Sequence, residues 1–292
     1  MENKEELEQY RKNFMAYFKK LKIANTLILL GAFIIFACDF IFLKDYATLP
    51  WIIAVVLIIA MFIIVNIIKK SLSTRTQKYV DTYYKNTSNY LLNNAKVTEI
   101  EFLSDDTLNI DSVNAARIMK EVVFTHSRNN LTFKLDDKEV KMADLVFKVT
   151  NPKDSKKPII AFCGKFMQCQ VEKEFEGRTL IYRKTTMPDC YGPNDIEGLE
   201  KIIDDDKLLV YSSNKNFKKI ITSDILEKLN SIEINDYLYD FTISLNGNMI
   251  VIALSYADKI MVIPSYEEVP FEALDKVSKD LNVIINDVLK NL

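Results

Sequence analysis

The sequence predicts a membrane-anchored α+β protein. It has a two-helix transmembrane hairpin with a helical stalk, then a cytoplasmic domain with a mainly antiparallel sheet and flanking helices. Three observations lead to this fold class. Two apolar stretches of about twenty residues each lie near the N-terminus. Runs with alternating apolar and polar residues fill much of the remaining chain, and short helical patterns stand between those runs.

The composition bounds the classes of protein that the chain can represent. Its 292 residues are enough for one large or two small domains, each with its own core. Hydrophobic residues make up 49% and charged residues 27%, but the apolar ones are concentrated near the N-terminus. The net charge of -2 gives no global attraction to nucleic acid, so we expect no nucleic-acid partner.

Residues 23–43 and 49–68 are each as long as a helix that crosses a hydrocarbon core of about 30 Å. The second stretch, LPWIIAVVLIIAMFIIVNII, carries no charge, and only KDYAT separates it from the first. We therefore expect two antiparallel spans, with Tyr46 and Trp51 at the lipid–water boundary. The first span is too long for a signal-peptide core and is followed at once by another span.

Basic residues predict the orientation of these spans. Positive side chains flank the outer ends of the hairpin, and the connecting loop has only Lys44. The flanking ones are Lys4, Arg11, Lys12, Lys19, Lys20 and Lys22 before the first span, and Lys69, Lys70, Arg75 and Lys78 after the second. Because positive charge stays inside, we expect a multi-pass protein of the cell membrane with both termini in the cytoplasm.

Asp39 lies inside the first apolar stretch, four residues before Leu43. At ~1.5 Å per residue this places it about 6 Å from the end of the span, where a carboxylate costs much less than at the bilayer centre. We interpret Asp39 as a marker of the membrane boundary. The alternative is a proton or ion site.

Two aromatic stripes predict the stalk. Apolar side chains recur at helical spacing in residues 1–22 and again in residues 69–96. The stripes are Leu7, Tyr10, Phe14, Tyr17 and Leu21, and Val80, Tyr83, Thr87 and Leu91. Residues 1–22 form an amphipathic juxtamembrane helix that pairs with the stalk of residues 69–96, and the stalk offers a route to self-association. An amphipathic helix lying on the membrane surface is the rival interpretation.

Residues 97–292 are expected to form the cytoplasmic α+β domain and to fold without lipid. Its first predicted helix covers residues 111–124, with Asp111 or Ser112 as the N-cap. Further helices are predicted over 194–204, over 223–232 with Ser223 or Asp224 as the cap, and over 271–292. Predicted strands are LTFKL, DLVFKV, PIIAFCGKFMQCQV, RTLIYR, KLLVYSS, KIMVIPS and the two arms of a hairpin turning at Asn246-Gly247.

Several segments of this domain resemble a bacterial membrane family known as domain of unknown function 3137. Phe162, Gly164 and Phe166 fit a Phe-x-Gly-x-Phe segment, and Phe175, Gly177 and Thr179 fit the Phe-x-Gly-x-Thr segment that follows. Later positions that fit are Tyr211, Ile221 and Leu226, whereas Val171 and Glu172 stand where the family often has Asn-Lys. The resemblance implies this architecture without a known activity, and it implies LemA-type membrane proteins as possible partners.

The residues that could carry chemistry do not assemble into a motif, so we assign no catalytic, cofactor-binding or metal-binding residue. His126 is the one histidine and is interpreted as a solvated residue near a helix end. The acidic triplet at 204–206 is interpreted as a solvated turn. Phe162 and Phe166 share a strand face and are assigned to the core. The cysteines at 38, 163, 169 and 190 are interpreted as reduced thiols.

Two hypotheses about function follow. The first is a membrane-tethered interaction or scaffold module, whose partners are the lipid bilayer and an unknown protein. The second is a membrane-associated enzyme with an unrecognised site, for which several ionisable groups would have to converge in one pocket. A subunit of a small oligomeric transporter ranks third. We favour the non-enzymatic module.

Overall fold

A computed structural model describes residues 4–42, 49–103, 108–119, 122–151, 154, 156–172, 174–184, 195–235, 237–256 and 268–292. Contacts divide the chain into two units. The helical unit consists of Asn3–Asn86 with Pro264–Val269, and the sheet unit consists of Thr87–Ile263 with Pro270–Leu292.

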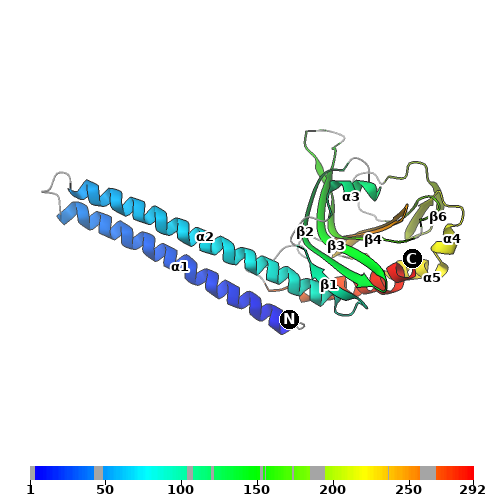
Figure 1. Ribbon diagram of the computed structural model, residues 1–292, viewed down its shortest axis with the longest axis horizontal. Coiled ribbons are helices and arrows are strands. Elements are labelled where there is room, and N and C mark those ends of the chain that lie inside the picture. The colour runs from blue at the N-terminus through cyan, green and yellow to red at the C-terminus, as the bar shows by residue number, and fades with distance from the viewer. Residues whose placement is uncertain are drawn as a thin grey trace. The chain divides into compact units, whose positions relative to one another are not determined.

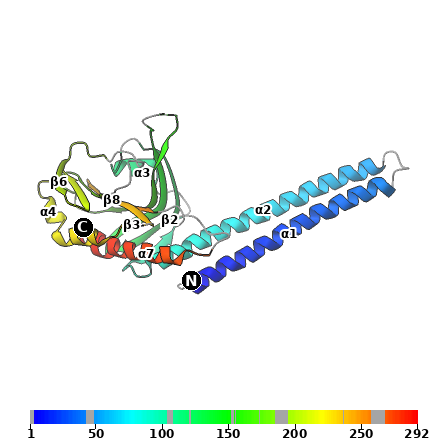
Figure 2. The same cartoon turned by 180° about the vertical axis from the view of Figure 1, so that it is seen from behind.

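Two long helices make up most of the helical unit. Helix α1 covers Lys4–Phe42 and helix α2 covers Leu49–Leu92, and they run side by side in opposite directions (Figures 1 and 2). Tyr79 of α2 stacks on Phe14 of α1 with ring centroids 3.8 Å apart, and on Tyr10 at 5.5 Å. Burial raises the pKa of Tyr79 to about 12. The two stripes therefore contact each other. The buried contact residue on α2 is Tyr79, whereas the predicted stripe contained its neighbour Val80.

The apolar part of α2 is exposed in the structure. By length and composition, α2 from Trp51 onward is long and apolar enough to cross a membrane. Its side chains at Trp51, Phe62 and Ile67 are all more than half exposed. The backbone of Asp39 lies in α1, but its side chain and residues 43–48 are outside the described part of the chain.

The sheet unit confirms the expected α+β fold with a mainly antiparallel sheet. Among the described residues, nine strands form one sheet in the order β1-β2-β3-β4-β9-β8-β5-β7-β6, and every pair is antiparallel. The strands are β1 (Thr98–Phe102), β2 (Val122–Leu135), β3 (Lys138–Val149), β4 (Ile159–Gln170), β5 (Thr179–Arg183), β6 (Glu200–Asp204), β7 (Leu208–Ser212), β8 (Leu238–Asn246) and β9 (Met249–Tyr256).

Helices lie on both sides of this sheet. Helix α3 (Ile110–Ala115) lies on one side, over a core that includes Phe147, Phe162 and Phe166. Helix α7 (Phe271–Asn282) lies on the other side (Figures 1 and 2). It continues as a π-helical segment η1 (Val283–Val288) and a short 3₁₀ turn η2 (Leu289–Asn291). Helices α4 (Phe217–Ile220) and α5 (Ser223–Ser231) follow β7.

The predicted helix over 111–124 is much shorter in the structure. Asn109 is the N-cap, and its side-chain oxygen accepts a hydrogen bond of 3.0 Å from the backbone N–H of Ser112. The helix ends at Ala115, and the β-branched Val122 and Val123 belong to strand β2. Only the first part of the predicted segment, up to Ala115, forms a helix.

The helix predicted over 194–204 is wrong. Glu200–Asp204 form β6, the strand at the edge of the sheet, which pairs with β7. Pairing with β7 supplies hydrogen bonds that local propensity does not report, so tertiary context decides this segment. The cap of α5 is also one residue earlier than expected, because the Thr222 hydroxyl accepts from the N–H of Ile225. The expected strand KIMVIPS lies outside the described residues.

The predicted hairpin between β8 and β9 forms, but its turn is shifted by one residue. Asn246 pairs with Met249, so the two loop residues are Gly247 and Asn248. Gly247 has φ 59°, and Asn248 is not among the described residues with positive φ. A type I′ turn needs positive φ at both positions, whereas a glycine at the first position suits type II′.

The predicted domain range of 97–292 leaves out a segment that the contacts assign to the sheet unit. Ser88, Leu91 and Leu92, at the end of α2, are each at most 2% exposed. The Ser278 hydroxyl of α7 donates a hydrogen bond of 2.9 Å to the Leu91 carbonyl. Helix α2 thus begins in the helical unit and ends in the sheet unit.

Candidate functional site

The residues of the Phe-x-Gly-x-Thr segment contact the β8–β9 turn and the end of β7. The backbone N–H of Phe175 donates to the Gly247 carbonyl at 2.7 Å. Gly177 has φ +80°, and a Cβ there would lie 2.8 Å from the Ser213 hydroxyl oxygen. Thr179 shares a hydrogen bond of 2.7 Å with Ser212. The segment is therefore a connection leading into β5, and the positive φ at position 177 requires a glycine there.

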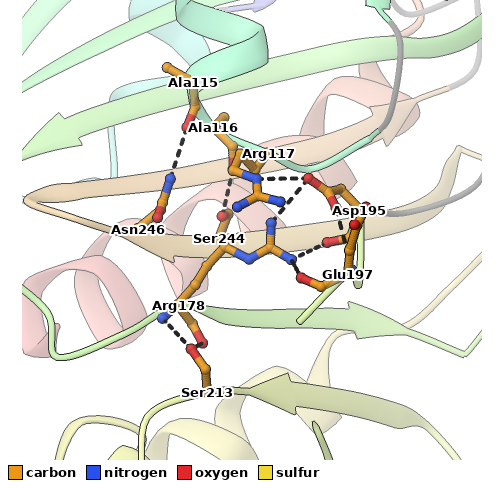
Figure 3. Close-up of polar contacts among 9 residues, drawn as sticks. All are labelled: Ala115, Ala116, Arg117, Arg178, Asp195, Glu197, Ser213, Ser244 and Asn246. Carbon is orange, nitrogen blue, oxygen red and sulfur yellow. Dashed lines mark hydrogen bonds and ion pairs between the residues drawn. The ribbon is translucent and has the colours of Figure 1, made fainter. Parts of the chain in front are cut away.

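Arg178, inside this segment, forms a cluster with Arg117 and Asp195 (Figure 3). Both guanidinium groups donate to the same carboxylate oxygen, Arg117 at 2.8 Å and Arg178 at 3.1 Å. Arg178 also donates to the backbone carbonyls of Asp195 and Glu197. The cluster thus joins the end of α3, the entry to β5 and the loop before β6.

The electrostatics of this cluster follow from two positive groups that share one carboxylate. Burial lowers the pKa of Arg178, and the charge of Arg117 lowers it further, against the effect of Asp195. Burial alone would raise the pKa of Asp195, but the hydrogen bond from Arg117 and the charge of Arg178 hold it below its usual value. Arg178 is 5% exposed, so its ion pair with Asp195 is buried.

The carbonyl groups that end α3 are also capped at this cluster. The Ser244 hydroxyl donates to the Ala116 carbonyl at 2.7 Å, and the Asn246 amide donates to the Ala115 carbonyl at 3.1 Å (Figure 3). Side chains from β8 therefore satisfy the groups that a helix end leaves open. The arrangement acts as a clamp that holds α3 to the sheet.

A polar cavity lies elsewhere in the sheet unit, between the end of α2 and the α7–η1 helix. Its volume is about 640 Å³, within the usual range of ligand pockets. Amide and charged side chains dominate its walls, and we call this cavity the amide groove. They are Tyr90, Asn93, Asn94, Lys96, Asp275, Ser278, Lys279, Asn282, Val283, Asn286 and Asp287.

Hydrogen bonds across the amide groove hold its two walls together. The Tyr90 hydroxyl donates to the Asp275 carboxylate. The Asn286 side chain accepts from the Lys96 N–H at 2.9 Å and donates to the Asn94 carbonyl at 3.4 Å. The Asn282 Oδ1 atom is buried and finds no hydrogen-bond partner among the described residues. These bonds use the Asn286 side chain, whereas the exposed side-chain amides of Asn93 and Asn94 in the lining can offer donors and acceptors to a polar ligand.

The π-helical segment η1 forms part of the groove wall. Val283, Asn286 and Asp287 belong both to η1 and to the lining. Such segments are rare and occur frequently at functional sites, because the wider turn changes the direction of side chains and backbone groups. We therefore take the amide groove as the candidate binding site.

A second polar network is buried under the last turn of α2. Lys165 of β4 forms an ion pair with Asp144 of β3, and both are at most 4% exposed. The Asn129 amide donates to Asp144 at 3.2 Å and its oxygen accepts from the Ser88 hydroxyl at 3.1 Å. The network links α2 to the centre of the sheet.

Two carboxyl groups in the sheet unit have strongly raised pKa values. Burial raises the pKa of Asp280 on α7 to about 7, and burial raises that of Asp240 on β8 to about 7 as well. Burial and the neighbouring Asp280 also raise the pKa of the Tyr256 hydroxyl. Asp280 Oδ2 and the Tyr256 hydroxyl find no hydrogen-bond partner among the described residues. Burial thus favours the protonated form of all three groups.

The structure places the residues singled out from the sequence as follows. His126 lies exposed in the middle of β2 and not at a helix end, which corrects its predicted setting. Phe162 and Phe166 are core residues, as predicted. Asp204 ends β6 and pairs with Lys184 and Lys201, whose hydrogen bonds lower its pKa to about 2.

The other candidates are equally dispersed. Asp205 accepts hydrogen bonds from the N–H groups of Lys207 and Leu208 in the β6–β7 turn. Cys38, Cys163 and Cys169 are not in disulfide bonds, and Cys190 lies outside the described residues. Within the described part of the chain, no three His, Cys, Asp or Glu residues are placed to hold a metal ion.

Sequence reasoning missed both the cluster of two arginines around Asp195 and the amide groove. Arg117, Arg178 and Asp195 are far apart in sequence, and only the fold brings them together. The groove residues lie in two segments, 90–96 and 275–287, separated by the entire sheet. The one available signal was the concentration of asparagines in YLLNNAK and in the NVIIND stretch.

Comparisons with known proteins give little. No family model matches the chain, and no curated protein matches it in sequence. The resemblance to domain of unknown function 3137 therefore stays a prediction. Among solved structures, the chain is similar to the mycobacterial trehalose monomycolate transport factor A, TtfA, with 10% sequence identity and a TM-score of 0.35. The match covers 66% of this chain and 88% of TtfA. Similarity of this size does not establish a shared fold.

Proposed function

We propose that this protein is a membrane-tethered interaction module. In this proposal α1 and α2 cross the bilayer as a hairpin, both termini lie in the cytoplasm, and the sheet unit recruits a protein partner at the inner membrane surface. The observation that carries the proposal is the continuity of α2. One helix contains an exposed apolar stretch from Trp51 onward and ends in buried residues of the sheet unit.

The charge pattern supports the proposed orientation. Basic side chains flank the outer ends of the apolar stretches of α1 and α2, whereas the predicted connecting loop has only Lys44. The exposed side chains of α1 between Ile23 and Ile41 supply a second apolar surface of suitable length, at about 1.5 Å per residue. Together they support two spans and a cytoplasmic sheet unit.

The amide groove is the proposed contact for the partner. The exposed amide side chains of Asn93 and Asn94 both donate and accept, so they suit the backbone N–H and C=O groups of an extended polypeptide segment. The lining contains Asp275 and Asp287 as well as Lys96 and Lys279, so its formal charges balance. We therefore propose a polar peptide segment as the ligand, with a LemA-type membrane protein as the partner that the family resemblance suggests.

Orientation can be tested by cysteine labelling in intact cells. All four native cysteines are replaced, and single cysteines are introduced by Lys218→Cys on α4 or by Lys44→Cys in the predicted loop. An impermeant maleimide should label the second variant and not the first until the cells are opened. Labelling of Lys218→Cys in intact cells would overturn the proposed topology.

The partner contact can be tested by photo-crosslinking in native membranes. A photoreactive residue replaces Lys279 in the amide groove, and the matched control carries it at the exposed Lys218. One protein should crosslink from position 279 and not from 218, and Asp287→Lys should abolish the product at unchanged protein level. Equal products from both positions, or none from 279, would contradict the proposed role of the groove.

A further inference from the structure

The end of the sheet where β2 starts and β3 stops carries an exposed apolar patch. Ile160, Val123 and Phe124 are 52%, 46% and 45% exposed, and they are the three most exposed large apolar side chains described in the sheet unit. Single exposed apolar residues are ordinary on a protein surface, whereas a group of them at one place calls for an explanation.

Strand register places this patch in one row with a lysine. Phe124 on β2 pairs with Lys148 on β3, which pairs in turn with Ile160 on β4. Paired residues point to the same face of a sheet, so the three side chains form a row across three strands. The Lys148 ammonium lies 5.1 Å from the centre of the Phe124 ring, a cation–π distance.

Two bulges turn the row outward. The β2–β3 register shifts between Val122 and Phe124, and the β3–β4 register shifts between Phe147 and Lys148. Val122 and Phe147 still point into the core, whereas Val123 is the extra residue and is exposed. Bulges that redirect side chains at the end of a sheet are typical of binding edges.

The surroundings of the row are basic. Exposed Lys156 and Lys157 lie in the connection between β3 and β4, which joins Lys148 and Ile160 of the row along the chain. Asp154 is the one acidic residue described between Lys148 and Ile160, and it accepts from the Lys156 N–H and lies 4.0 Å from the Lys157 ammonium. Three described lysines against one aspartate leave a positive balance around the apolar side chains.

This combination fits a lipid surface better than a protein surface. Apolar side chains with surrounding lysines are the pattern of segments that enter the headgroup region of anionic bilayers. Long lysine side chains can lay their apolar stems among the lipids while the ammonium groups reach the phosphates. The cores of protein interfaces, in contrast, are depleted in lysine.

We propose that the row of Phe124, Lys148 and Ile160, with Lys156 and Lys157, binds the surface of an anionic bilayer. The inference rests on the proposed function, because the membrane anchor supplies the bilayer. The contact would give the sheet unit a second attachment to the membrane besides α2. The amide groove lies on other elements, α2, α7 and η1, so neither site shares a lining residue with the other.

The chain contains a single tryptophan, Trp51 in α2, which makes a two-part test possible. The full chain is placed in nanodiscs of phosphatidylcholine with or without phosphatidylglycerol, each with brominated acyl chains as quencher. Unaltered protein reports on the anchor through Trp51. A double variant, Trp51→Phe with Phe124→Trp, reports on the patch alone.

We expect Trp51 emission to be quenched in both kinds of disc. Emission from the indole introduced by Phe124→Trp should be quenched and shifted to the blue only with phosphatidylglycerol, and less so at high salt. Adding Lys156→Glu and Lys157→Glu should remove this quenching. The matched control, Trp51→Phe with Ile202→Trp on β6, should stay unquenched.

The possible failures are distinguishable. Quenching of Trp51 without any quenching at position 124 would overturn the lipid contact and leave the anchor in place. Absence of quenching at both positions would overturn the anchor as well. Quenching at position 124 that is equal in both discs, or unaffected by the two glutamates, would contradict the proposed selectivity for anionic lipid. A protein that crosslinks to the patch while the indole stays unquenched would show a protein interface instead.

Discussion

The Ser278 hydroxyl on α7 donates a hydrogen bond to the Leu91 carbonyl at the end of α2, over a distance of 2.9 Å. The two residues are nearly two hundred positions apart, yet both are buried. This contact places the last turn of the long helix among the core elements of the sheet unit. The sheet unit therefore begins inside a helix and not after it.

The first prediction concerns where the sheet unit can be cut. A chain that starts at Asn86 should fold without detergent, whereas one that starts at Lys96 loses the buried side chains of Leu91 and Leu92. At about 1.5–3 kcal/mol for each buried leucine, the loss is a large share of the stability of a domain. Urea unfolding followed by circular dichroism should show a lower midpoint or no folded state for the shorter chain. Equal midpoints would support the boundary at 97.

The second prediction concerns Asp280. Its pKa is 3.8 in an ordinary setting and about 7 in the folded protein, so between these values the folded chain holds a proton that the unfolded chain has lost. Stability should therefore fall as the pH rises from about 4 to about 7 and level off above that.

Asp280→Asn should remove much of this fall and stabilise the chain at pH 8, by an amount on the order of 3 kcal/mol. Unfolding midpoints at pH 5 and pH 8 would measure it, with the exposed Asp224→Asn as the matched control. Asp240 will leave a residual dependence, because its pKa is also about 7. An unchanged pH profile in Asp280→Asn would contradict the buried neutral carboxyl group.

The third prediction concerns the buried pair of Lys165 and Asp144. Lys165→Met leaves the carboxylate without its cation, and such a loss typically costs about 3–5 kcal/mol. Lys165→Met together with Asp144→Leu should recover most of the stability, because no charge is then left in the interior. The matched control is the exposed pair of Lys290 and Asp136, at 3.1 Å, where Lys290→Met should cost about 1 kcal/mol or less. A double variant no better than Lys165→Met would show that the ion pair itself is needed.

The fourth prediction explains the glycine of the Phe-x-Gly-x-Phe segment. A Cβ atom at Gly164 would lie 1.9 Å from the backbone oxygen of Leu254 on β9. The two strands would have to separate, so Gly164→Ala should cost more than about 3 kcal/mol, at the upper end of overpacking effects. Cys163→Ala, one residue away and half-buried, should cost far less. Thermal unfolding of both variants would decide, and a mild effect of Gly164→Ala would show that β4 and β9 can adjust.

Much of the sheet was predictable because alternation and local turns determine it. β7 and β8 contain alternating residues, β9 is a continuous apolar run, and the hairpin between β8 and β9 was located to within one residue. The antiparallel character follows from the short connections. Gly177, which the sequence places in the Phe-x-Gly-x-Thr segment, has a positive φ that other residues rarely adopt.

Edge and boundary elements were not predictable. The segment that forms β6 has a helix-like spacing, and only its pairing with β7 makes it a strand. Helix α3 ends early because the following β-branched residues are taken into β2. These outcomes depend on partner strands that are distant in sequence, and a local sequence pattern contains no information about them.

The candidate sites were hidden for the same reason. Arg178 and Asp195 are ordinary charged residues in sequence, and they are buried where the end of α3, the entry to β5 and the segment before β6 meet. The amide groove needs α2 and α7 to meet, which no local spacing indicates. Exposure of Phe124 was also unpredictable, because the bulge that turns it outward has no clear sequence signature.

The π-helical segment Val283–Val288 has a consequence for tracing the ancestry of this protein. A π turn accommodates one residue more than an α turn, so the insertion of a single residue into a regular helix would produce it. A relative whose last helix is regular should be one residue shorter in this stretch, with the same apolar side chains facing the sheet on both sides of the gap. An alignment drawn without that gap would pair Leu289 with a solvent-facing position and hide the relationship in the segment nearest the C-terminus.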